Sequence, residues 1–274
     1  MLAGRVRILP QRGTLLVSGD LHGHLGDFAT LRGVFEDLRT RFVEAHWVLL
    51  GDLVHGPSDE ARARQPELYD APDESWAVIA AVRELVARHP GRVHVVLGNH
   101  DYGHVGGPHT AKFHADEVAQ LEASLSPAQL EQLRALYASA LLAVVAPCGA
   151  LLCHGSPNLS LLALADLDRV CLPPQTERER ALIAAVVQGY GQPGPVAMEV
   201  LARASRDAGH RLTMILHGHD RDEVGWFTEG GNQLCPVIFG APRAQKRYVR
   251  LDLGVEYRSL ADLREAEEIL RLYP

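Results

Sequence analysis

Three apolar segments in the first hundred residues each end in glycine followed by a side chain that can bind a metal. The segments span residues 14–17, 46–50 and 92–97, and their Leu, Val and Trp content is typical of buried strands. Apolar residues at three- and four-residue spacing follow the first two segments, which indicates helices packed on a sheet. This repeated β-α order predicts an α/β fold.

The side chains that follow these strands share one position, the carboxyl end of the strand. In open α/β sheets this edge is where ligands bind. Two later strand-like runs, near residues 150 and 215, lead into histidines in the same way. An Asp after Gly is usually a turn former, but turn chemistry does not explain five such loops in order. The pattern therefore predicts a divalent-metal site. Its candidate residues are Asp20, His22, Asp52, Asn99, His100, His154 and His219.

Composition limits the partners that we expect. The chain has 274 residues, of which 47% are hydrophobic, so it can bury an ample core. Its net charge of −7 argues against a nucleic-acid partner. No run approaches the roughly 18 apolar residues of a membrane span, and none resembles a signal peptide. Four isolated cysteines fit reduced thiols. We expect a cytoplasmic protein without a membrane partner, and nothing in the sequence specifies an oligomeric state.

The candidate ligands lie between residues 20 and 219, so we expect residues 1–274 to fold as a single domain. A helical insertion is expected around 110–140, because Ser126-Pro127-Ala128-Gln129 forms a capping box with proline at the first helical position. A charged helix is expected at about 259–272. The sequence has only two lysines, at 112 and 246, and nothing in its pattern assigns them a function.

The five loops together resemble the five blocks of the calcineurin-like metallophosphoesterases. Within that superfamily they are most similar to the phosphoprotein phosphatase branch, which includes bacterial Ser/Thr protein phosphatases and diadenosine tetraphosphatases. The resemblance implies an αββα sandwich of two mixed sheets flanked by helices. It rests on Gly19-Asp20-Leu21-His22-Gly23, Gly51-Asp52, Gly98-Asn99-His100-Asp101, His154-Gly155 and Gly218-His219, with weaker support from 153–159 and 239–242.

The resemblance also implies a role for each candidate residue. Asp20 and His22 would bind a first metal ion, and Asp52 would bridge two. The second ion would be held mainly by Asn99, His154 and His219. His100 would donate a proton to the leaving oxygen. Mixed carboxylate, amide and imidazole ligands suit manganese, iron, zinc or cobalt better than magnesium, and the resemblance favours manganese.

This ligand set predicts a phosphoric ester hydrolase in which a metal-bridging hydroxide attacks phosphorus in line. The expected substrates are phosphate monoesters, either a phosphoprotein or a small phosphate ester. The alternative is a nucleotide phosphodiesterase or pyrophosphohydrolase, such as a diadenosine tetraphosphatase. A non-catalytic scaffold is disfavoured because all the inferred ligands and His100 are intact.

The second block departs from the pattern of the phosphatase branch on its substrate side. Where that branch has G-D-x-x-D-R-G, this chain reads Gly51-Asp52-Leu53-Val54-His55-Gly56-Pro57. His55 replaces the aspartate that orients the proton donor, and either its ring or a water would take that role. Gly56 replaces the arginine that grips phosphate. We expect another arginine to do so and rank Arg243 ahead of Arg221, because its loop overhangs the metals in the resembled fold. His55 itself resembles the G-D-L-F-H block of repair nucleases, but Arg221 stands where those enzymes carry a further histidine.

Overall fold

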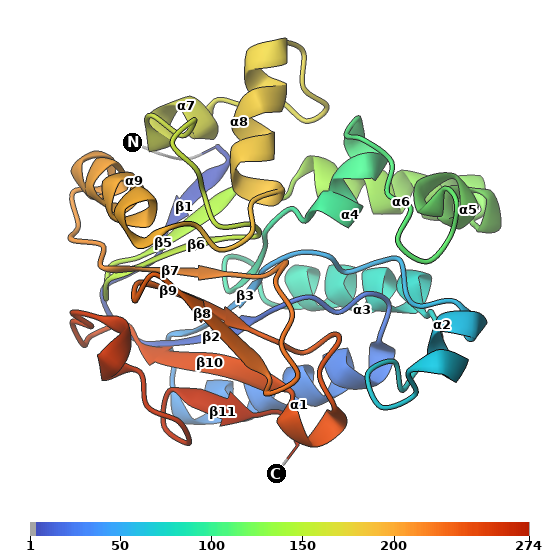
Figure 1. Cartoon of the computed structure of the whole chain (residues 1–274), viewed down its shortest axis with the longest axis horizontal. Coiled ribbons are helices and arrows are strands. Elements are labelled where there is room, and N and C mark those ends of the chain that lie inside the picture. Colours follow the sequence, from blue (N-terminus) through green and yellow to red (C-terminus); the bar gives the residue numbers. More distant parts are fainter. Residues whose placement is uncertain (1–3, 274) are drawn as a thin grey trace.

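Two β-sheets packed face to face form the centre of the computed structural model, which describes residues 4–273 (Figure 1). The six-stranded sheet has the order β1 (Val6–Ile8), β5 (Ala143–Ala146), β6 (Ala150–Cys153), β7 (Met214–His217), β9 (Gln233–Pro236) and β8 (Trp226–Glu229). The five-stranded sheet has the order β11 (Ile269–Arg271), β10 (Arg247–Asp252), β2 (Thr14–Ser18), β3 (Ala45–Leu49) and β4 (Val93–Val95). The predicted sandwich of two mixed sheets is confirmed.

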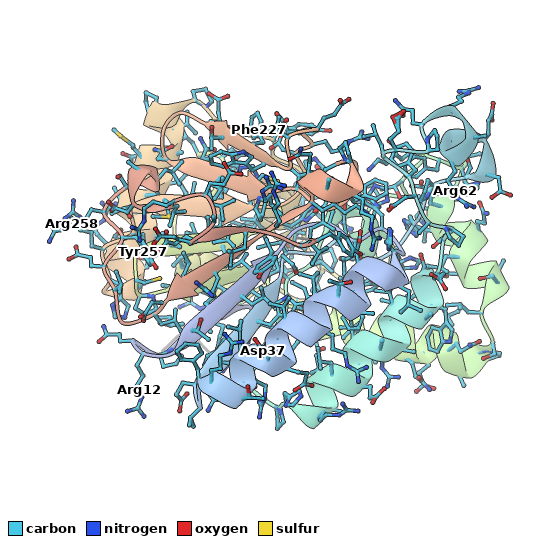
Figure 2. The ribbon with its side chains drawn as sticks, turned by 90° about the horizontal axis from the view of Figure 1, so that it is seen from below. Arg12, Asp37, Arg62, Phe227, Tyr257 and Arg258 are labelled. Atoms are coloured by element: carbon cyan, nitrogen blue, oxygen red, sulfur yellow. The ribbon has the colours of Figure 1, made fainter. Side chains whose placement is uncertain are left out.

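Helices cover the outer faces of both sheets. The five-stranded sheet is covered by α1 (Leu25–Arg41) and α3 (Ser75–Arg88), which run side by side in Figure 2. On the other side lie α7 (Leu164–Asp168), α8 (Glu177–Val187) and α9 (Gly194–Ala208) (Figure 1). Shorter helices flank the carboxyl ends of the strands: α2 (Asp59–Arg64) and α4 (Asn99–Tyr102). Within residues 4–273, no helix is long and apolar enough to span a membrane.

The core follows the two-residue period of the strands. In β2, Leu15 and Val17 belong to the apolar cluster between the sheets, which includes Leu216 from β7. The intervening Leu16 belongs instead to the cluster that includes Phe35 of α1. All these side chains have no exposed surface. Burying each contributes on the order of 1.5–3 kcal/mol, so the register of β2 is strongly fixed.

Parallel pairing brings the ends of the central strands to one edge. β2, β3 and β4 are parallel neighbours in one sheet, and β6 and β7 are parallel neighbours in the other. Their carboxyl ends therefore point the same way within each sheet. The loops that leave these five strands carry the predicted ligands, so the fold alone gathers them.

The helical insertion predicted around 110–140 is confirmed as α5 (Glu117–Ser124) and α6 (Pro127–Ala138). The charged helix predicted at 259–272 is wrong. A 3₁₀ turn at Leu260–Asp262 is followed by β11, which pairs antiparallel with β10 and buries Ile269. The free edge of β10 offers this segment hydrogen bonds and an apolar face, and these outweigh its helical propensity.

A buried ion pair fastens the start of β10 to the first helix. The Lys246 ammonium donates to Asp27 at 2.7 Å and to Asp70 at 2.9 Å. Asp27 also accepts a 2.7 Å hydrogen bond from the Tyr273 hydroxyl. The side chains of Lys246 and Asp27 are each 1% exposed, so removing the ammonium would leave a buried carboxylate without its lysine partner.

We expect Lys246→Met to lower the free energy of unfolding by about 3 kcal/mol or more, because a buried carboxylate would lose its cation. Urea denaturation measures this change. The matched control is Arg41→Met, which removes the exposed partner of Asp37 on α1 and should cost less than about 1 kcal/mol. Similar losses in the two variants would contradict a structural role for the buried pair.

Candidate metal centre

The loops at the shared edge have strained backbones. A positive φ is uncommon for a residue other than glycine and marks backbone held in place by its surroundings. Among residues 4–273, five such residues occur, and only Ala266 lies away from this edge. The other four are His22 (φ 42°), Asp52 (φ 49°), His55 (φ 67°) and His219 (φ 70°). The strained residues are therefore concentrated at the edge where the sequence predicts the metal site.

Asp101 holds the loops after β3 and β4 together. Its carboxylate accepts backbone hydrogen bonds from Asp52 at 2.8 Å, Leu53 at 3.0 Å and Gly98 at 3.0 Å. Gly51 makes the approach of these loops feasible, because a Cβ there would lie 2.5 Å from the Gly98 nitrogen. The position of Asp52 is therefore set by backbone groups from two loops.

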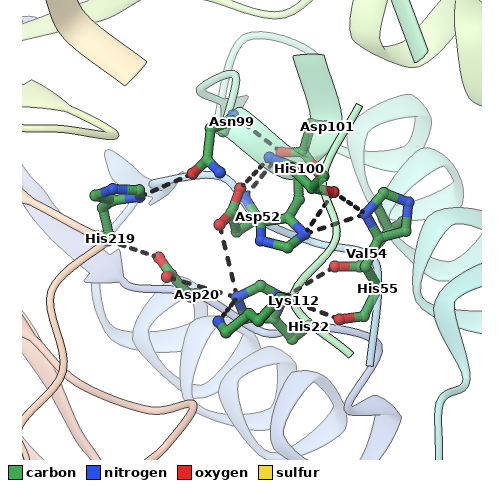
Figure 3. Close-up of polar contacts among 12 residues, drawn as sticks. Asp20, His22, Asp52, Val54, His55, Asn99, His100, Asp101, Lys112 and His219 are labelled. Atoms are coloured by element: carbon green, nitrogen blue, oxygen red, sulfur yellow. Dashed lines mark hydrogen bonds and ion pairs between the residues drawn. The ribbon is translucent and has the colours of Figure 1, made fainter. Parts of the chain in front are cut away.

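The two carboxylate oxygens of Asp52 face different histidines. Oδ2 lies 3.6 Å from His22 Nε2, whereas Oδ1 lies 3.5 Å from His154 Nε2. On the latter side, Asn99 Oδ1 lies 2.9 Å from His154 Nε2. It also lies 2.8 Å from His219 Nδ1 (Figure 3). Asp52 therefore stands between two groups of donor atoms, one at His22 and one at His154.

Asp20 completes the half that contains His22. Its Oδ2 lies 3.9 Å from His22 Nε2, and its Oδ1 accepts a 3.1 Å hydrogen bond from the His219 backbone. The structure thus brings all six predicted metal ligands together. Asp20, His22, Asp52 and His154 are buried, and Asn99 and His219 are partly buried.

The orientation of the imidazoles fits cation binding. His22 Nδ1 donates to the carbonyls of Val54 and His55 at 3.1 Å, and His154 Nδ1 donates to the Leu50 carbonyl at 2.9 Å. Each hydrogen bond fixes the tautomer and leaves the Nε2 lone pair directed at the carboxylates, as in metal-ligating histidines. Facing lone pairs repel unless a cation lies between them, so this donor set suits divalent cations.

The electrostatics of the centre agree with this geometry. Burial raises the pKa of Asp20, and the neighbouring Asp52 carboxylate raises it further. Burial alone would lower the pKa of His154, but the carboxylates of Asp52 and Asp20 raise it. The cage therefore has an anionic field that draws positive charge.

A lysine ammonium supplies part of that charge. Lys112 Nζ lies 3.1 Å from His22 Nε2, although much of the residue's surface remains exposed. Removal of the ammonium from water lowers its pKa to about 8, and Arg221 acts in the same direction, while Asp52 and Asp20 oppose them. The Lys112 ammonium thus places a positive charge beside a predicted metal-ligating nitrogen.

Four of the ligands, Asp20, Asp52, Asn99 and His219, line a cavity of about 480 Å³. Lys112 and Arg221 also line it, and Arg221 donates to the Tyr69 hydroxyl at 3.0 Å. Arg243 lies outside this cavity, with its guanidinium 3.5 Å from the centre of the Tyr273 ring. The structure thus brings Arg221 to the candidate centre and leaves Arg243 away from it, the reverse of the order ranked from sequence.

Two further predicted residues lie on the α4 side. His100 lines the cavity, and its backbone donates a 2.9 Å hydrogen bond to Asp52 Oδ1. His55 is buried behind it, with Nδ1 3.1 Å from His100 Nδ1. His55 does not line the cavity, so its predicted contact with substrate has no support in this arrangement.

Sequence reasoning missed three residues at this centre: Lys112, Glu117 and Tyr190. Lys112 was detectable only as one of two lysines in the chain. The Glu117 carboxylate lies 3.3 Å from His100 Nδ1, yet an acid at the start of a helix is an ordinary pattern. Tyr190 lines the cavity beside His219, with ring centres 4.4 Å apart, and no local motif marks it.

An α/β sandwich whose parallel strands gather carboxylate, amide and imidazole ligands at one edge is typical of metal-dependent hydrolases. The model of the calcineurin-like phosphoesterases matches residues 13–221. The chain belongs to this family and is a metal-dependent phosphoric ester hydrolase. None of the curated proteins matches it significantly in sequence.

Solved structures share the fold at low identity. A protein serine/threonine phosphatase from Saccharomyces cerevisiae is 17% identical, with a TM-score of 0.55, over 85% of this chain and 71% of that one. The cold-active protein-tyrosine phosphatase of a psychrophilic Shewanella species is 13% identical, with a TM-score of 0.53, over 93% and 81%. A putative diadenosine tetraphosphatase is 15% identical over 90% and 93%, with a TM-score of 0.46, which is too low to bear on function.

We expect Asp52→Asn to lose bound metal, because one carboxylate faces both groups of ligands. Asparagine tolerates the left-handed backbone, so the fold should persist. Metal content after dialysis, measured by plasma mass spectrometry, should fall well below that of the unaltered chain, together with the hydrolytic rate. Asp37→Asn, at an exposed acid on α1, is the control. Full metal content in Asp52→Asn would contradict the shared-ligand arrangement.

Proposed function

We propose that the chain, acting as one domain, is a dinuclear metal-dependent phosphatase of phosphate monoesters, either phosphoproteins or small phosphate esters. The observation that carries this proposal is the division of ligands around Asp52, whose oxygens face His22 on one side and His154 on the other. A carboxylate between two donor groups suits two cations roughly 3.5–4 Å apart. The mixed donors suit manganese, with iron, zinc or cobalt as alternatives.

The residues of the centre have separate tasks in this proposal. Asp20 and His22 would hold one cation, Asn99, His154 and His219 the other, and Asp52 both. The bound cations would supply a water that ionises near neutral pH and would neutralise phosphate charge. His100 lines the same cavity and would donate a proton to the leaving oxygen.

The substrate side of the cavity supports a monoester. A phosphate monoester carries two negative charges at neutral pH, one more than a diester. Lys112 and Arg221 both line the cavity, and both residues are exposed. A guanidinium and an ammonium on one wall match a dianion, so we assign these two residues the grip that Gly56 cannot provide.

One observation favours a second function, hydrolysis of nucleotide phosphodiesters or pyrophosphates such as diadenosine tetraphosphate. The Tyr190 side chain is 61% exposed at the cavity, beside His219. An exposed aromatic ring next to a phosphate site can stack a nucleobase, and such stacking is worth about 1–3 kcal/mol. In the first function, binding energy comes from the two charges of the phosphate monoester. In the second, it comes from stacking of a nucleobase.

A substrate screen tests the proposal. We expect the manganese-loaded protein to hydrolyse a phosphopeptide and p-nitrophenyl phosphate with kcat/KM at least about tenfold above that for bis-p-nitrophenyl phosphate and diadenosine tetraphosphate. The Asp52→Asn variant measures the background rate. A preference for diadenosine tetraphosphate that falls in Tyr190→Ala would favour the nucleotide function instead.

We expect Lys112→Met and Arg221→Ala each to lower kcat/KM for the monoester by at least about tenfold, or 1.4 kcal/mol, and to lower it less for the diester. The reason is that both cations face a charge the diester lacks. The control, Arg243→Ala, removes the other arginine that was predicted to contact phosphate. This arginine lies outside the cavity, so its loss should change neither rate. If Lys112→Met and Arg221→Ala lowered kcat/KM equally for monoester and diester, these residues would not recognise the dianion. If only Arg243→Ala lowered the rate, Arg243 would be the phosphate-binding arginine, as ranked first from the sequence.

A further inference from the structure

A buried carboxylate from the helical insertion faces the back of His100. Glu117 is the first residue of α5 and its side chain is 1% exposed. Its Oε1 accepts a 2.8 Å hydrogen bond from the Phe113 backbone. Its Oε2 has no hydrogen bond of good geometry within residues 4–273, and the imidazole nitrogens near it are His100 Nδ1 at 3.3 Å and His55 Nδ1 at 4.0 Å. A buried anionic oxygen is costly unless a polarised N–H is directed at it.

The hydrogen bonds among His104, His55 and His100 determine which imidazole can donate an N–H to Glu117. His104 Nδ1 lies 3.0 Å from Glu122 Oε1 and must donate to it, which leaves His104 Nε2 as an acceptor. His55 Nε2, 3.0 Å away, must then donate to His104, so His55 Nδ1 is also an acceptor. Because two facing acceptors repel, His100 Nδ1, 3.1 Å from His55 Nδ1, carries the proton.

The same cluster contains a hydroxyl that completes the hydrogen bonding. Thr110 Oγ1 lies 3.2 Å from His100 Nδ1 and 3.3 Å from His55 Nδ1. The Nδ1–H of His100 can donate a hydrogen bond to the Glu117 carboxylate while the Thr110 hydroxyl donates to His55. A charged acceptor binds an N–H about twice as strongly as a neutral one, so Glu117 is the preferred partner of His100.

We propose that Glu117 is the positioning residue for His100, accepting its Nδ1 proton and holding Nε2 at the cavity. The insertion thereby supplies in space the carboxylate that the second block lacks at His55. The proposal rests on the role of His100 as proton donor in the proposed function. In that step the Nε2 proton passes to the leaving-group oxygen, and the ring keeps its Nδ1 proton. Glu117 stays ionised throughout.

Glu117→Gln tests this role, because glutamine can keep the Phe113 hydrogen bond while losing the charge. We expect kcat for an alkyl phosphate to fall at least about tenfold, with little change for p-nitrophenyl phosphate, whose leaving group needs no proton, and with KM unaltered. In a His100→Asn background the same substitution should have no further effect. The matched control, Glu131→Gln, alters an exposed acid of α6 in the same insertion and should change neither rate.

Three kinetic outcomes would overturn the proposal. One is unchanged turnover of alkyl phosphate. Another is an equal loss for both leaving groups with a raised KM, which would mean that Glu117 only braces the loop carrying Lys112. The third is a full additional loss in the His100→Asn background, since Glu117 would then act independently of His100.

A measurement without turnover separates this proposal from the proposed function. In the zinc-loaded, ¹⁵N-labelled protein, NMR should show His100 protonated at Nδ1, with a downfield proton resonance that His100→Asn removes. Glu117→Gln should move that resonance upfield. An unmoved resonance would overturn the positioning role even if the enzyme is active. A shifted resonance in a protein that prefers diesters would support the positioning role and refute only the monoester assignment.

Discussion

The hydrogen bonds around Asp52 are the constraint on which the centre depends. The Asp52 carbonyl accepts from the backbones of Leu21 at 3.0 Å and His22 at 2.8 Å, while its own N–H donates to Asp101. Asp52 thereby joins the loops after β2, β3 and β4. Because these bonds use the main chain, both side-chain oxygens remain directed at His22 and His154. A left-handed backbone at this position is the cost of that arrangement, and only a surrounding sandwich that is already well packed can impose it.

The packing of the sheets explains how so many charged groups can be buried together. Carboxylates without a cation would raise their pKa or destabilise the fold, and the Lys112 ammonium relieves only part of this field. The apolar layer between the sheets does not include the ligands, which lie beyond the strand ends, in loops or, for Asn99, at the first residue of α4. Stability and chemistry are therefore separated in space: the strands contribute burial, and the loops hold the charges that favour cation binding.

The features that could be predicted from the sequence are those encoded by short, contiguous segments. Each ligand block is a few residues long and follows a strand, so the α/β class and the convergence of Asp20, Asp52 and His154 could be inferred without coordinates. The C-terminal strand β11 could not be inferred and was predicted as helix, because its pairing with β10 depends on a sheet edge more than ten residues away in the chain. The strand β1 was missed for the same reason, because its partner β5 lies far along the chain. Arg243 was ranked first as the phosphate-binding arginine because of the loop that carries it. Its guanidinium instead stacks on Tyr273, a partner that sequence spacing does not reveal.

The insertion connects the two features that sequence reasoning could not supply. Lys112 and Glu117 are five residues apart, and the Phe113 N–H bonded to Glu117 lies between them. One carboxylate thus orders the loop that presents the ammonium and faces the ring of His100. The second block lacks both the carboxylate and the arginine of the phosphatase pattern. In our proposals Glu117 would replace the carboxylate, and Lys112 would share the phosphate contact with Arg221. In these proposals Lys112 would act on phosphate binding and Glu117 on proton transfer, whereas the ligand blocks would act on metal binding.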